Sequence, residues 1–176
     1  MVDGINNLEA GHDSLYFKIA SSLLQGTSLV AIMLSLYIYC KSDFKIKNNA
    51  VAPLLVLEIR GNEMYSQRLL TNDVLNVLEN TGKLQHTGNQ QFCNIENFPW
   101  ISVIAVNSHH GNYGKDEDFN SEWVNLIAIV GSKSDPENET LYVNMLTEIA
   151  EKINWELILE EDDNENKNIV LKEKLR

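Results

Sequence analysis

The segment between residues 107 and 121 carries the densest group of side chains that could do chemistry. His109 and His110 are followed by the acidic run Asp116-Glu117-Asp118. Imidazole and carboxylate groups bind divalent metals and act as general acids and bases. However, adjacent histidines point in different directions on an extended chain, and no third histidine or cysteine stands at ligand spacing. We therefore predict a solvated surface loop here, without a metal site.

The run Gly131-Ser132-Lys133-Ser134 lies between an apolar segment and a helical pattern, where phosphate-binding loops are found. It lacks the GxxxxGK[ST] spacing of such loops. The following helix also opens with Asp135, Glu137 and Glu139, which would repel a bound anion. A pairing of Cys93 with His86 as nucleophile and base has no other support in the sequence. We predict no catalytic residue and no cofactor.

Residues 162–173, DDNENKNIVLKE, resemble the calcium loop of EF-hand proteins, with oxygen-bearing side chains at the first, third, fifth and twelfth positions. Lys167 stands where that loop requires glycine, and its charge would oppose the ion. We therefore predict an acidic hairpin loop at this place.

The overall charge is acidic, with 14 Lys and Arg against 25 Asp and Glu, a formal net charge of -11. Nucleic-acid binding requires a basic surface, so this balance argues against it and favours a basic protein partner. The candidate partner-binding residues are the loop residues His109, His110, Tyr113, Asp116, Glu117 and Asp118, together with Asp162 and Asp163 near the C-terminal end.

Residues 19–40, IASSLLQGTSLVAIMLSLYIYC, contain no charge, and a helix of this length spans about 30 Å of bilayer core. Three lysines follow within residues 41–47, which predicts a cytoplasmic C-terminal part and a single-pass protein of the cell membrane. In the alternative interpretation, residues 29–39 form a buried strand of a cytoplasmic protein. The predicted organisation is a polar segment 1–18, a transmembrane helix 19–40, a linker 41–52 and a globular domain 53–176.

Apolar runs predict strands at 54–59, 101–106, 123–130, 155–160 and 168–172. Helical spacing predicts a helix at 71–80, and a second helix that begins after Asp135 and ends at Asn154. Residues 83–97 are ambiguous, with Thr87-Gly88-Asn89 resembling a turn between two weak extended pieces. The order of these elements predicts an α+β fold, a transmembrane helix followed by a ferredoxin-like (βαββαβ) domain or a similar two-layer α/β sandwich.

The stretches FPWISVIAV (98–106), EWVNLIAIVGSKSD (122–135) and INWELILEEDD (153–163) together resemble the small acidic immunity proteins of bacterial polymorphic-toxin systems. The resemblance extends over about residues 50–172 and carries over no functional residue. It implies neutralisation of a cognate toxin by stoichiometric binding, and a membrane anchor would be a departure from it.

Two classes of function follow. The first is a non-catalytic, acidic, membrane-anchored interaction domain that binds a basic protein, in the specific case a toxin. The alternative is a metal-dependent enzyme or sensor that uses the 107–121 loop through His109, His110 and Asp116.

Overall fold

The computed structural model describes residues 54–133 and 135–175. This part of the chain forms a seven-stranded sheet in the order β3-β4-β5-β7-β1-β8-β9, and every neighbouring pair is antiparallel. The strands are β1 (Leu54–Arg60), β3 (Leu84–Gly88), β4 (Gln91–Asn94), β5 (Ile101–Val106), β7 (Leu126–Ser132), β8 (Glu156–Glu161) and β9 (Lys167–Lys172). A short second ladder joins β2 (Leu69–Leu70) to β6 (Trp123–Val124).

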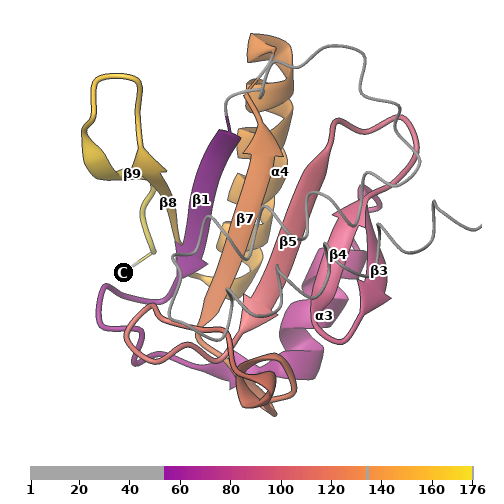
Figure 1. Cartoon of the computed structure of the whole chain (residues 1–176), viewed down its shortest axis with the longest axis vertical. Coiled ribbons are helices and arrows are strands. Elements are labelled where there is room, and N and C mark those ends of the chain that lie inside the picture. The colour runs from indigo at the N-terminus through magenta and orange to yellow at the C-terminus, as the bar shows by residue number, and fades with distance from the viewer. Residues whose placement is uncertain (1–53, 134, 176) are drawn as a thin grey trace, which may run out of the picture. The chain divides into compact units, whose positions relative to one another are not determined.

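Two α-helices, α3 (Thr71–Glu79) and α4 (Pro136–Ile153), cover one face of the sheet (Figure 1). The core lies between them and the sheet, where alternate residues of each central strand, such as Leu57 and Ile129, pack with helix residues such as Met145. Strand β5 is buried along its whole length, and β7 is buried up to its last residue. This confirms the predicted central strand at 101–106. The run predicted as one central strand at 123–130 instead forms the short β6 and then the central strand β7.

Local signals place α4 as predicted. Asp135 accepts a hydrogen bond from the Glu137 N–H at 2.9 Å, Pro136 occupies the first turn, and Asn154 ends the helix in the left-handed conformation at φ 53°. Proline has no N–H to leave unpaired at this position, and asparagine tolerates a positive φ. These features are independent of tertiary packing, which is why the sequence alone predicts both ends of the helix.

The predicted fold class, a transmembrane helix followed by a ferredoxin-like (βαββαβ) domain or similar sandwich, is wrong. The described part of the chain is a sheet-rich α+β fold with two α-helices and a sheet of seven strands. The hairpin β3–β4 adds to one side of the sheet, and β9 adds to the other. Strand β3, Leu-Gln-His-Thr-Gly, buries its first residue and exposes the other four. It therefore lacks the alternation by which a strand is recognised in a sequence.

The prediction of a single-pass membrane protein is also corrected. Within residues 54–133 and 135–175, no helix has both the length and the apolar character needed to cross a membrane. The predicted anchor 19–40, the segment 1–18 and the linker 41–52 lie outside the described residues, as does the alternative strand at 29–39.

Candidate functional site

The segment that joins β5 to β6 lies at one end of the sheet and includes the short 3-10 helix η1 (Asp116–Phe119) (Figure 1). The side chain of Asn125, which is 1% exposed, holds the start of this segment from inside the fold. The Asn125 Oδ1 accepts hydrogen bonds from the Ser108 N–H at 2.6 Å and the Ser108 hydroxyl at 3.0 Å. Its Nδ2 donates to the carbonyls of Tyr65 at 2.9 Å and of Ser108 at 2.8 Å. One amide therefore holds the start of this loop against the chain that follows β1.

Asp118 fixes the far part of the loop in a similar way. Its side chain is 3% exposed, and its Oδ2 accepts hydrogen bonds from the backbone N–H groups of Gly114 at 2.9 Å and Lys115 at 3.0 Å. The Asp118 carbonyl accepts a hydrogen bond from the Asn107 N–H at 3.1 Å. Asp118, predicted to bind a partner, thus supports the loop from within.

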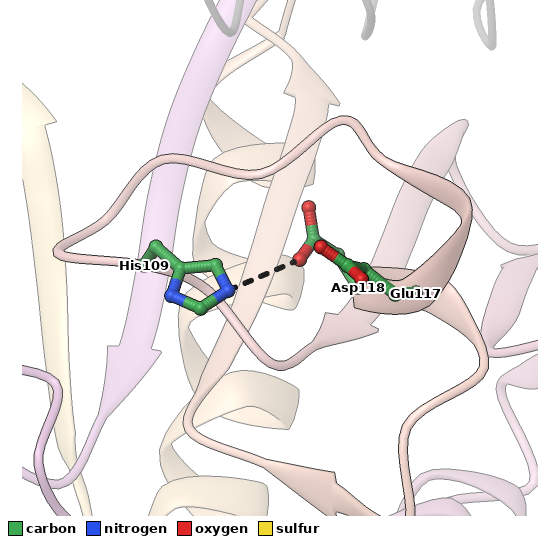
Figure 2. Close-up of side chains that lie close together, drawn as sticks. All are labelled: His109, Glu117 and Asp118. Carbon is green, nitrogen blue, oxygen red and sulfur yellow. Dashed lines mark ion pairs between the residues drawn. The ribbon is translucent and has the colours of Figure 1, made fainter.

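His109 and Glu117 are exposed and lie beside Asp118 (Figure 2). The His109 Nε2 is 3.9 Å from the Asp118 Oδ1, and one ligand atom from each of the three residues lies within 4.8 Å of the others. A β-bridge to Asn112 holds the backbone of His109. His110 and Asp116, which the metal-dependent alternative invoked, are exposed and belong to no such group in the described residues.

A hollow of about 410 Å³ lies next to this loop. Its lining residues are Leu70, Thr71, Asn72, Asn120, Ser121 and Glu122. Leu70 pairs with Trp123 across the short β2–β6 ladder, and both side chains stay about two-fifths exposed, at 40% and 41%. The prediction placed Trp123 at the start of a buried strand and missed this pair, because the ladder that exposes it joins residues far apart in the sequence.

A buried polar cluster occupies the sheet near the loop. The Glu58 Oε2 accepts hydrogen bonds from Arg60 at 3.1 Å and from the Tyr65 hydroxyl at 3.0 Å, while burial raises the pKa of Glu58. Burial, and then the charge of Glu58, raises the pKa of Glu160 to about 7. The Tyr113 hydroxyl is buried without a hydrogen-bond partner in the described residues, and burial raises its pKa. The hydroxyl of Tyr113, a residue predicted to bind a partner, therefore lies inside the fold.

The two remaining predicted residues, Asp162 and Asp163, lie in the turn between β8 and β9, at the opposite end of the sheet from the 107–121 loop (Figure 1). The Asp162 carboxylate accepts hydrogen bonds from the backbone N–H groups of Asn164 and Asn166 and from the Asn166 amide, which lower its pKa. Asp163 forms an ion pair with Lys133. The predicted hairpin is confirmed, and the structure does not bring its acidic residues to the loop.

No protein-family model matches the chain, and no curated protein matches its sequence. The resemblance to immunity proteins therefore remains a prediction, and the functional argument rests on the residues described above.

Proposed function

We propose that this chain is a non-catalytic, acidic interaction domain that binds a basic protein through the end of the sheet that carries the loop and the β2–β6 ladder. The observation that carries this proposal is the exposed pair Leu70 and Trp123 at the edge of a hollow whose wall includes Glu122. The name Trp123 surface is used below for the Leu70–Trp123 pair, the hollow, and the exposed carboxylates Asp116 and Glu117 of η1.

The Trp123 surface has the composition of a protein-binding site. Interfaces concentrate their binding energy in a few aromatic and large apolar side chains, surrounded by a polar rim. Here Trp123 and Leu70 provide the apolar centre, and the exposed Glu122 provides an acidic rim in the wall of the hollow. The exposed carboxylates of η1 follow on the same loop, where the hollow-lining Asn120 donates a hydrogen bond to the Asp116 carbonyl. A partner's Lys or Arg can pack its aliphatic stem and its cation on the indole face, with a carboxylate close by. The complementary partner is therefore basic.

The backbone beneath this surface is held in place. The Thr71 N–H donates to the Glu122 carbonyl at 2.9 Å, and the Thr71 hydroxyl donates to the Ser121 carbonyl at 2.7 Å. The Gln90 amide donates to the same Ser121 carbonyl at 2.9 Å. A surface that is ordered before binding loses less conformational entropy on binding, which favours affinity.

The same contacts argue against catalysis in the hollow. Its wall carries two hydroxyl groups, and both interact with backbone, because the Thr71 hydroxyl donates to Ser121 and the Ser121 hydroxyl accepts the Trp123 N–H. The wall contains no histidine, cysteine or lysine to act as base or nucleophile. The exposed aromatic and the acidic rim favour binding.

The partner we propose is a basic toxin that this chain neutralises by stoichiometric binding. The support is the net charge of -11 together with the resemblance to acidic immunity proteins. Opposite charges on the two proteins accelerate their encounter and disfavour acidic competitors.

The test uses a photo-crosslinking amino acid in the full-length chain, produced in its native cells. It replaces either Trp123 or, as the matched control, Leu141 on α4, since the two side chains are equally exposed at 41% and 42%. We expect position 123 to trap a basic protein in a one-to-one adduct that position 141 does not trap. Equal trapping at both positions, or no adduct at position 123, would contradict the proposal.

The toxin assignment is tested with the trapped protein. We expect its expression alone to stop growth, and co-expression of this chain to restore growth. If the trapped protein is harmless, the toxin assignment fails while the interaction through the Trp123 surface stands.

A further inference from the structure

The two oxygens of the Asp118 carboxylate have different environments. While Oδ2 accepts two backbone hydrogen bonds, Oδ1 makes no hydrogen bond within the described residues. The His109 Nε2 lies 3.9 Å from Oδ1, beyond hydrogen-bond distance, and the Asp118 side chain is only 3% exposed. The backbone therefore fixes the carboxylate through Oδ2, while Oδ1 stays available as a ligand atom beside the imidazole.

We propose that His109, Glu117 and Asp118 bind a divalent transition-metal ion, of which Zn²⁺ is the best match. Each residue offers one ligand atom, and the three atoms lie within 4.8 Å of one another (Figure 2). Ligand atoms that share a tetrahedral zinc ion at about 2.0–2.2 Å lie about 3.3–3.6 Å apart. The His109–Asp118 distance of 3.9 Å is slightly longer, so small movements of the exposed His109 and Glu117 side chains complete the set.

The ligand chemistry selects the type of ion. Two carboxylates balance the charge of a dication, and an imidazole favours zinc and its neighbours over magnesium and calcium, which prefer oxygen alone. The site has three protein ligands, so water fills the remaining position.

One ion pair competes with the metal. The Lys115 ammonium lies 3.5 Å from Glu117, with both side chains largely exposed. Such solvent-exposed ion pairs are weak, so a dication displaces the lysine readily. The site is thus rigid at Asp118 and adaptable at its two exposed ligands.

This inference does not depend on the proposed partner. A bound ion would join η1 to the His109 bridge across the loop, and, because Glu117 belongs to the Trp123 surface, it would also reduce the negative charge of that surface. The loop would then have two states, one with and one without the bound ion, and the metal concentration would determine their populations.

The test is isothermal titration of the full-length chain with ZnCl₂, and with MgCl₂ for comparison. We expect zinc to bind and magnesium to bind far more weakly. His109→Ala and Glu117→Gln should weaken zinc binding by about tenfold or more, a change equivalent to at least about 1.4 kcal/mol. Both residues are exposed, so neither substitution threatens folding.

The chain offers matched controls at adjacent positions. His110→Ala and Asp116→Asn remove the same functional groups from exposed neighbours that lie outside the cluster, and both should bind zinc within about twofold of the parent. Zinc binding that survives both His109→Ala and Glu117→Gln would overturn the inference. So would equal losses in the adjacent controls, or an absence of zinc binding in the parent.

Discussion

A buried carboxylate, Glu58, and a partly buried one, Glu160, lie on neighbouring strands and make the stability of the folded protein depend on pH. Burial raises the pKa of Glu58 and, together with the charge of Glu58, raises that of Glu160 from 4.5 to about 7. Between these two values the folded chain keeps a proton on Glu160 that the unfolded chain has lost. Because the folded state binds more protons there, its stability decreases as pH rises from about 4.5 to about 7.

Replacing Glu160 with glutamine should reduce this loss. We expect the difference in free energy of unfolding between pH 5 and pH 8 to shrink by about 1 kcal/mol, less than the full pKa shift implies because Glu160 is partly exposed and screened by solvent. The measurement is urea denaturation at both pH values, with Glu161→Gln on the exposed neighbour as control. An unchanged pH dependence in Glu160→Gln would refute the role of Glu160.

The Asn125 side chain anchors the start of the 107–121 loop. Its substitution by alanine leaves the Ser108 N–H, the buried Ser108 carbonyl and the partly buried Tyr65 carbonyl without this partner, so we expect a loss of about 2–3 kcal/mol in the free energy of unfolding. The loop 107–121 should also become cleavable by protease under native conditions. The control is Asn120→Ala, which removes an exposed amide whose one hydrogen bond is to the Asp116 carbonyl. Equal effects of the two substitutions would contradict the anchoring role of Asn125.

At the scale of elements, the predictable parts are those determined by local sequence. Asp135, Pro136 and Asn154 set the limits of α4 without help from distant residues, and β5 is recognisable because its six residues are all buried. Strand β3 forms because its backbone pairs with β4, and a polar strand held by pairing leaves no hydrophobic pattern to recognise. The Leu70–Trp123 pair was missed for a similar reason, since it depends on contact between distant segments.

The packing of α4 on β7 depends on the absence of a side chain at Gly131. A Cβ added there would lie 2.9 Å from the ring of Tyr142, which is fully buried and donates a hydrogen bond to the Trp100 carbonyl at 2.8 Å. We therefore expect Gly131→Ala to destabilise the fold by about 1–3 kcal/mol, as overpacking does.

A double-mutant cycle identifies the cause. In the background of Tyr142→Leu, which removes the ring, Gly131→Ala should cost markedly less free energy of unfolding than in the parent. If the cost of Gly131→Ala is the same in both backgrounds, the clash with Tyr142 is not its origin.

At the scale of the whole molecule, the strand order decides which acidic residues act together. The sequence grouped Asp162 and Asp163 with the 107–121 loop because all are acidic, but β8 runs away from that loop and carries its turn to the other end of the sheet. Within the loop, the sequence alone did not separate the supporting residue Asp118 from the exposed residues, because burial inside a loop depends on the backbone that folds around it.

The net charge of -11 predicts how the partner binds. Raising the salt concentration from about 0.05 M to about 0.5 M should slow association with the basic protein by about tenfold, because salt screens long-range attraction between exposed charges. The dissociation rate should change much less, since it depends on the short-range contacts. Surface plasmon resonance measures both rates, and a salt-independent association rate would remove the electrostatic part of the proposal.

The most direct test of the proposed interaction compares the affinities of Trp123→Ala and Leu141→Ala for the trapped partner. Both substitutions remove an equally exposed large apolar side chain, one at the Trp123 surface and one on α4. We predict that Trp123→Ala raises the Kd by about 30-fold, the effect of a loss of about 2 kcal/mol at a binding hot spot, whereas Leu141→Ala leaves the Kd within about twofold. A Kd unaffected by Trp123→Ala, or affected equally by both substitutions, would contradict the account.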